Sequence, residues 1–220
     1  MNNATDGSTG PRSDDPVGIV LAGGASSRMG RDKALLEARG GILPALAARR
    51  LATVCAEVAV ADAGRGLLPA LPSLADGPGR GPAAGILGGA AAYPGRRLLV
   101  LACDLPRVPP ALLAELARLP AADWVIPRWT GGVEPLCALY GPAALAALGR
   151  RVERGRLALH TLFEEGLAAR VLEGEALARF GEPGEIFLNL NTPEDWERYV
   201  STEPGAPPQD PQGQISRRKS

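Results

Sequence analysis

The chain has 220 residues, 45% of them hydrophobic, and its 24 Lys and Arg residues are balanced by 24 Asp and Glu residues. This balance excludes the basic excess typical of nucleic-acid binders, and no apolar run is long enough to cross a bilayer. The polar first 15 residues lack the features of a secretory signal. We therefore expect a cytoplasmic protein with no nucleic-acid and no membrane partner.

Composition predicts one domain between two tails. Residues 1–16 are polar and rich in Asn, Asp, Ser, Gly and Pro, so we expect a disordered N-terminal tail. Residues 201–220 contain several prolines and end in a basic cluster, which indicates a second disordered tail. Residues 17–200 are enough for one sizeable hydrophobic core. The three cysteines are odd in number and widely spaced, as is typical of reduced core thiols.

Short apolar runs alternate along the domain with Ala-, Leu- and Arg-rich helical patterns. We expect strands at residues 17–22, 57–61, 98–103, 124–127, 134–140 and 186–191. We expect helices at residues 43–51, 86–92, 109–119, 142–148 and 157–165, and a last one that begins at Pro193 with Thr192 as its N-cap. This alternation predicts an α/β fold of three layers, Rossmann-like, with a mostly parallel central sheet and helices on both faces.

The stretch at residues 21–33, LAGGASSRMGRDK, follows the first predicted strand and is typical of a phosphate-binding loop. Gly23 and Gly24 remove side chains where a ligand approaches, so backbone N–H groups can converge on an anion. Arg28 and Lys33 add positive charge at short range. The stretch has neither a Gly-Lys-Ser/Thr sequence nor G-x-G-x-x-G spacing, which argues against a P-loop NTPase and a dinucleotide-binding oxidoreductase.

Asp104 follows the clearest predicted strand, residues 98–103. Ligands of open α/β sheets bind outside the carboxyl ends of the strands, so Asp104 and the Gly23–Gly24 pair are expected at one edge. Mg²⁺ accompanies nucleotides and takes carboxylate, phosphate and water oxygens, and Asp104 is a candidate ligand for it. The alternative is a helix cap or a turn.

Other polar residues admit two interpretations each. Asp76 lies in a segment that is a turn by composition. Asn189 and Asn191 alternate on the last predicted strand and would point to one face, as ligand contacts or as turn formers. Arg150 and Arg154 belong to a basic cluster at residues 150–156, which is either a solvated face or a phosphate clamp for a second substrate.

Four separated motifs together resemble the molybdenum cofactor guanylyltransferase family. Residues 21–36 follow its pattern Leu-Ala-Gly-Gly-x-Ser-x-Arg-Met-Gly-x-Asp-Lys-Ala-Leu-Leu, and residues 103–106 match its Cys-Asp-x-Pro segment. Residues 81–86 match Gly-Pro-x-x-Gly-Ile shortly after Asp76, and residues 189–195 match Asn-x-Asn-Thr-Pro-Glu-Asp. The motifs occur in the family's order and cover nearly the whole predicted domain.

The resemblance implies a fold of the nucleotide-diphospho-sugar transferase type. It implies an enzyme that transfers GMP from GTP to the terminal phosphate of molybdenum-molybdopterin, releases pyrophosphate and uses Mg²⁺. Molybdoenzymes or cofactor-assembly proteins would be its partners. The expected nucleotide contacts are Leu21, Ala22, Gly23, Gly24, Lys33, Asp62, Asp76, Gly81 and Asp104. The expected catalytic residues are Arg28, Lys33 and Asp104, with Asp104 as metal ligand, and the expected second-substrate contacts are Asn189, Asn191, Arg150 and Arg154.

One departure leaves the base open. The family commonly has an asparagine at the end of the second strand, where this chain has Asp62. An aspartate can accept hydrogen bonds from guanine N1–H and its amino group. The alternatives are a CTP-dependent molybdopterin cytidylyltransferase, a sugar-1-phosphate nucleotidyltransferase, or a non-catalytic nucleotide-binding partner in molybdoenzyme assembly. Retention of both Lys33 and Asp104 argues against the last of these.

Overall fold

The computed structural model describes residues 15–23, 32–38, 40–119 and 122–202. Gly24 and Arg28 of the predicted phosphate-binding loop lie outside these residues. Almost all of the two predicted tails lies outside them as well, so the prediction of disorder stays a prediction. Among the described residues, no helix combines the length and hydropathy needed to span a membrane.

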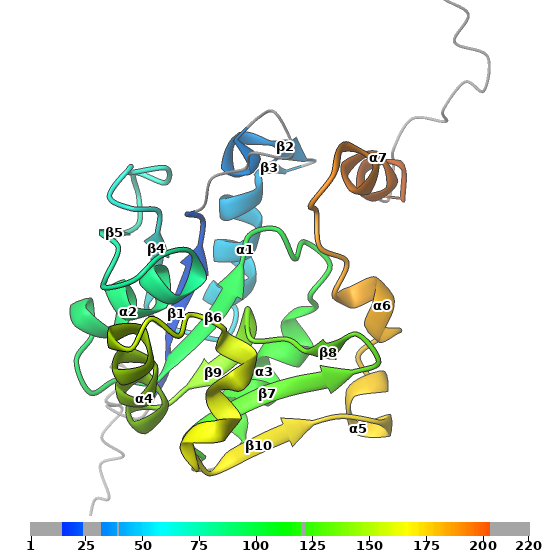
Figure 1. The fold of residues 1–220 in the computed structure, drawn as a ribbon. Helices are drawn as coiled ribbons and strands as arrows, with labels where there is room; N and C mark the ends of the chain where they lie inside the picture. Colours follow the sequence, from blue (N-terminus) through cyan, green and yellow to red (C-terminus); the bar gives the residue numbers. More distant parts are fainter. Residues whose placement is uncertain (1–14, 24–31, 39, 120–121, 203–220) are drawn as a thin grey trace, which may run out of the picture.

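A mixed sheet forms the centre of the molecule, with the strand order β10-β7-β9-β6-β1-β4-β5 and β8 paired to β7 (Figure 1). Its strands are β1 (Val17–Leu21), β4 (Val58–Ala61), β5 (Ser73–Leu74), β6 (Leu98–Ala102), β7 (Trp124–Trp129), β8 (Gly132–Val133), β9 (Cys137–Tyr140) and β10 (Ala169–Leu172). The central strand β1 pairs in parallel with β4 and β6, whereas β9 runs antiparallel to both of its neighbours, β6 and β7. A separate hairpin joins β2 (Glu37–Ala38) to β3 (Gly41–Ile42).

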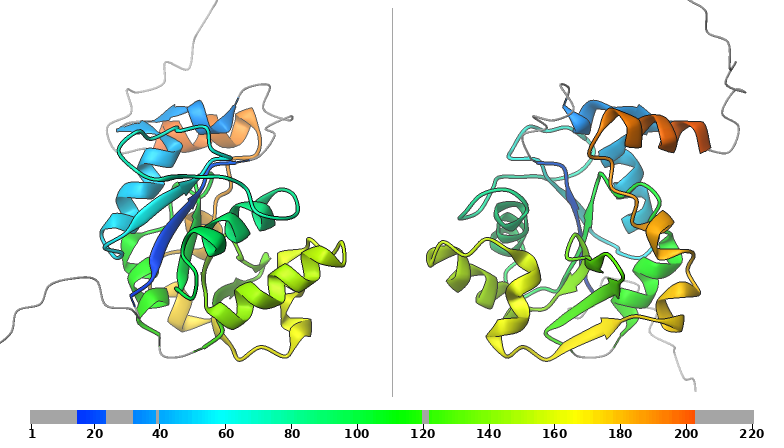
Figure 2. Two further views of the ribbon diagram at one scale, coloured as in Figure 1. Left: turned by 90° about the vertical axis from the view of Figure 1, so that its left-hand side faces the viewer. Right: turned by 45° about the vertical axis from the view of Figure 1, so that its right-hand side comes forward.

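Helices cover both faces of the sheet. The α-helices are α1 (Leu43–Ala52), α2 (Pro82–Ala92), α3 (Pro110–Arg118), α4 (Pro142–Glu153), α5 (Glu175–Ala178), α6 (Pro183–Ile186) and α7 (Pro193–Thr202). Two 3₁₀ helices are η1 (Lys33–Leu35) and η2 (Leu159–Glu165). Figure 2 shows α1 and α3 on one face of the sheet and α2 and α4 on the other. This arrangement confirms the three-layer α/β prediction.

The two-sided cover explains the strand sequences. Every residue of β1 and β6 is buried, which is why both strands are continuous apolar runs rather than alternating ones. The expected N-cap of the last helix is also confirmed, because Thr192 Oγ1 accepts a hydrogen bond from the N–H of Asp195 at 3.2 Å. The Asp195 carboxylate in turn accepts from the N–H groups of Asn191 and Thr192.

The strand predicted at residues 186–191 is wrong. Pro183 stands in the first turn of α6, which ends at Ile186, and residues 187–191 are irregular. The Leu190 N–H donates to the Asp104 backbone oxygen at 2.9 Å instead of to a neighbouring strand. Asn189 and Asn191 therefore do not share a strand face. The run predicted at 134–140 is a strand only from Cys137, and α4 continues past residue 148 to Glu153.

Candidate active site

Two parallel neighbours, β1 and β6, end at the same edge of the sheet. Leu21 is in register with Ala102, and the Cys103 N–H donates to the Leu21 oxygen at 3.0 Å. Gly23 and Asp104 follow these strand ends directly. The structure therefore confirms that the start of the predicted loop and Asp104 lie at one edge.

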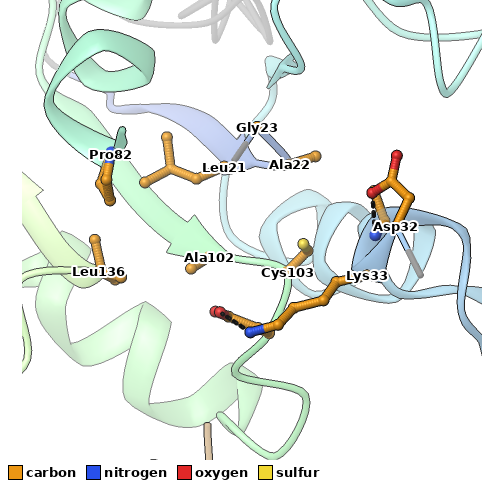
Figure 3. Close-up of a pocket in the computed structure, with 11 residues that line it drawn as sticks. Leu21, Ala22, Gly23, Asp32, Lys33, Pro82, Ala102, Cys103 and Leu136 are labelled. Atoms are coloured by element: carbon orange, nitrogen blue, oxygen red, sulfur yellow. Dashed lines mark hydrogen bonds and ion pairs between the residues drawn. The ribbon is translucent and has the colours of Figure 1, made fainter. Parts of the chain in front are cut away.

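A cavity of about 140 Å³ opens at this edge. Its lining residues are Leu21, Ala22, Gly23, Asp32, Lys33, Ala34, Pro82, Ala102, Cys103, Asp104 and Leu136. Figure 3 shows the Lys33 side chain extending across it from η1. Lys33 Nζ lies 3.7 Å from Asp104 Oδ2 and donates to Asn191 Oδ1 at 2.8 Å. The ammonium thus joins three segments that are far apart in sequence.

The Asp104 carboxylate is well suited to hold a cation. Its Oδ1 is buried and has no hydrogen-bond partner among the described residues. Burial raises the pKa of Asp104, and the nearby Lys33 ammonium opposes that rise. Asn189 Oδ1, on the segment that packs against the Asp104 backbone, is likewise buried without a partner. Carboxylate and amide oxygens are ligands of hard cations. The described residues contain no cluster of three His, Cys, Asp or Glu side chains that could hold a metal by themselves.

Glu134, which the sequence did not reveal, lies close enough to the site to interact with Asp104 and bonds to Leu136, a lining residue of the first cavity. Burial raises its pKa to about 7, and the negative charge of Asp104 adds to the rise. Its carboxylate accepts a hydrogen bond from the Leu136 N–H at 3.3 Å. Glu134 reaches this edge because β9 runs antiparallel to β6, so the start of β9 lies beside the end of β6. Strand direction is not evident from the sequence.

Arg65 is a second residue that the sequence did not reveal. Its guanidinium donates to the backbone oxygen of Ala22 at 2.5 Å and to that of Asp62 at 3.0 Å. It also pairs with Asp32 Oδ2 at 2.5 Å, and Asp32 caps η1 through the Ala34 N–H. Arg65 therefore ties the end of β1 to the start of the helix that carries Lys33. An arginine between two turn glycines is the only sequence signal for this role.

Asp62, the expected contact at the end of β4, is not exposed at this edge of the sheet. The side chain is fully buried and lines neither of the two cavities at this edge. Its Oδ2 accepts from the Leu67 N–H at 2.8 Å and its Oδ1 from Ser73 Oγ at 2.5 Å. Both oxygens are thus used to hold the connection between β4 and β5. The expectation that Asp62 contacts the nucleotide is corrected to a structural role, because the side chain is fully buried and a ligand in either cavity does not reach its oxygens.

A second cavity, of about 320 Å³, adjoins the first. It is lined by Leu21, Gly23, Ala61, Asp76, Gly79, Arg80, Gly81, Pro82 and Gly85. Leu21, Gly23 and Pro82 line both cavities. The predicted residues Asp76 and Gly81 therefore lie together beside the loop, and Arg80 joins them.

No arginine of the basic cluster lines either cavity. Arg151 is buried and pairs with Glu164 and Glu165, so it fixes α4 to η2. Arg150 and Arg154 are exposed at the end of α4 and line neither cavity. Their part in binding a second substrate stays a prediction.

A Rossmann-like sheet with a lysine, an aspartate and two adjoining cavities at its carboxyl edge fits the class of the nucleotidyltransferases. Residues 18–171 match the family described as "MobA-like NTP transferase domain". The chain belongs to this family.

Curated relatives agree with this assignment, and a solved structure has the same fold. The chain is 37% identical over 193 residues to a "probable molybdenum cofactor guanylyltransferase" of Chloroflexus aggregans, covering 81% of this chain and 90% of the relative. It is 36% identical to a protein of the same description from Opitutus terrae, and the match covers 83% of this chain and 93% of that relative. Among solved structures, molybdopterin-guanine dinucleotide biosynthesis protein A of Archaeoglobus fulgidus matches with a TM-score of 0.72 and 24% identity, covering 84% and 97%. The protein is a nucleotidyltransferase of molybdenum cofactor biosynthesis.

Proposed function

We propose that this enzyme transfers GMP from GTP to the terminal phosphate of molybdenum-molybdopterin, in the cytoplasm, and passes the product to molybdoenzymes or cofactor-assembly proteins. The descriptions of the curated relatives support the guanylyl group and the acceptor. The observation that carries the proposal is the pair of adjoining cavities, with Lys33 and Asp104 in one and Asp76 in the other. A nucleotide has the matching division into a charged phosphate chain and a base.

In this proposal the triphosphate lies in the cavity that contains Lys33. The Lys33 ammonium and the backbone at Leu21, Ala22 and Gly23 bind phosphate oxygens, with Gly24 and Arg28 completing the loop. Asp104 holds Mg²⁺, as its buried, unpartnered Oδ1 supports; the ion would neutralise phosphate charge. Asn191 holds the Lys33 ammonium inside the cavity before the nucleotide arrives.

The chemistry is a displacement at phosphorus. An oxygen of the acceptor's terminal phosphate attacks the α-phosphorus, the bond to the oxygen bridging the α- and β-phosphorus atoms breaks, and pyrophosphate leaves with that electron pair. Such a transfer needs alignment and charge neutralisation rather than a protein nucleophile. Lys33 neutralises charge on the phosphate chain, and Asn189 and Asn191 are proposed to orient the acceptor beside Asp104.

The test is a transfer assay with the purified protein, molybdenum-molybdopterin, Mg²⁺ and each of GTP, CTP, ATP and UTP. We expect pyrophosphate and a dinucleotide product, identified by mass spectrometry, with GTP. Product with CTP instead would replace the guanylyl assignment by a cytidylyl one. No product with any nucleotide, from protein that is folded by circular dichroism, would overturn the proposal.

A further inference from the structure

The second cavity, which the proposed function assigns to the base, is not lined by Asp62. Asp62 stands at the position where the family commonly has an asparagine, but its carboxylate is buried and bonded to Leu67 and Ser73. Base recognition therefore has to come from other residues that line the cavity.

We propose that Arg80 and Asp76 together select guanine. Arg80 donates to guanine O6 and N7, and Asp76 accepts from N1–H and the 2-amino group. The inference rests on the proposed function, because it takes the cavity beside Gly81 as the base site. It goes further by naming the groups that distinguish guanine from other bases.

The segment at residues 76–81, DGPGRG, presents few groups that can form hydrogen bonds. Three of its residues are glycines and one is proline, so Asp76 and Arg80 carry its only polar side chains. Both line the cavity, and the remaining lining side chains are apolar or absent. Side-chain recognition of a base in this cavity therefore depends on these two residues.

The backbone of the segment is fixed by close packing. The Gly77 N–H donates to the Ala84 oxygen of α2 at 2.8 Å, and a Cβ at Gly77 would lie 2.7 Å from the backbone of Leu87. A Cβ at Gly88 would lie 2.2 Å from the Ala75 oxygen. The segment thus lies directly on α2, and its two polar side chains start from fixed positions, as selective recognition requires.

Neither polar side chain is engaged within the described part of the chain. Asp76 and Arg80 are both exposed, and neither forms a hydrogen bond or an ion pair there, with each other or with another residue. By contrast, the Arg65 guanidinium, near the same edge, pairs with Asp32, and the Arg151 guanidinium, on α4, pairs with Glu164. The second cavity is thus lined by a hydrogen-bond acceptor, the Asp76 carboxylate, and by a group with several donors, the Arg80 guanidinium, and both lack a partner among the described residues.

This pair fits guanine by elementary hydrogen bonding. A guanidinium binds guanine O6 and N7 with two parallel N–H donors, and a carboxylate accepts from two adjacent N–H groups. Adenine presents an amino donor where guanine has O6 and a bare nitrogen at N1, so it mismatches both residues. Pyrimidines lack N7 and lose one of the two bonds to Arg80. The pair therefore favours guanine over the other three bases.

The test measures equilibrium binding of nucleotides by calorimetry, which needs no acceptor. GTP is compared with 7-deaza-GTP, which lacks N7, with ITP, which lacks the 2-amino group, and with ATP and CTP. The wild-type protein is expected to bind GTP more tightly than all four. Arg80→Gln is expected to weaken GTP binding by roughly 5- to 150-fold and to abolish the preference for GTP over 7-deaza-GTP. Asp76→Asn is expected to abolish the preference for GTP over ITP.

Two further variants separate recognition from simple charge. Arg80→Lys keeps the positive charge but lacks the guanidinium fork, so it is expected to lose the N7 preference like Arg80→Gln. Arg170→Gln removes another exposed arginine, from β10 at the opposite end of the sheet order, and is expected to change nothing.

The outcomes distinguish this inference from the proposed function. An unchanged preference for GTP over 7-deaza-GTP in Arg80→Gln overturns the assignment of Arg80, even if the wild type transfers GMP. Base-selective binding that both variants relax, without transfer in the assay above, supports the inference and overturns the proposed function. No nucleotide binding by folded wild-type protein overturns both.

Discussion

Replacing Glu134 by glutamine is expected to stabilise the folded protein above neutral pH. Burial raises the pKa of Glu134 from 4.5 to about 7. Between these two values the folded state keeps a proton that the unfolded state has released, so the free energy of unfolding falls as pH rises. The difference corresponds to roughly 3 kcal/mol as an upper bound, since each pKa unit is worth about 1.36 kcal/mol. Glutamine keeps the shape and does not titrate.

The measurement is urea unfolding of the wild type and of Glu134→Gln at several pH values from 4.5 to 8.5. The two proteins are expected to be nearly equally stable at the acid end and to separate as pH rises from about 4.5, with the stabilisation of the variant complete above about 7. Groups that titrate in both proteins and do not interact with Glu134 cancel in the difference. Glu153→Gln, at an exposed position on α4, is the matched control and should show no such separation. A stability difference between wild type and Glu134→Gln that does not depend on pH would refute the reasoning.

Three further substitutions test the site and its frame. Lys33→Met is expected to lower transfer by about 10²- to 10³-fold, as loss of one charge-stabilising donor does; unchanged pyrophosphate release would contradict its role. Asp104→Asn should abolish transfer in the same assay yet leave a protein no less stable to urea than wild type, because burial already raises the pKa of Asp104. Gly88→Ala should destabilise by about 1–3 kcal/mol, since its Cβ would lie 2.2 Å from the Ala75 oxygen; an unchanged unfolding midpoint would contradict that packing.

The strands at the centre of the sheet were predictable because a strand that is buried on both faces has an unbroken apolar sequence. Residues 17–22 and 98–103 correspond to β1 and β6 within one residue at the C-terminal end. The positions of Gly23 and Asp104 then followed, since parallel neighbours end at one edge of the sheet. These parts of the site depend on local pattern and on one general rule of topology.

The remaining parts depend on contacts that no local pattern encodes. Residues 186–191 have the apolar content of a strand, but Ile186, Phe187 and Leu188 are buried in the core without strand pairing, and the Leu190 N–H donates to the Asp104 backbone oxygen. Asp62 looked like a ligand by position, and only the fold of the β4–β5 connection shows that Leu67 and Ser73 use its oxygens. Glu134 reached the site through an antiparallel strand whose direction the sequence did not reveal.

The C-terminal part of the chain belongs to the site even though the family match ends at residue 171. Asp195 accepts from the Asn191 N–H, so the cap of α7 fixes Asn191, whose side chain accepts from Lys33 Nζ. Leu190 binds the Asp104 backbone in the same segment. Because these bonds position Lys33 and Asp104, two of the charged residues that line the first cavity, α7 acts as part of the scaffold of the site. Lys33 is thus held in the cavity by residues that lie far along the chain.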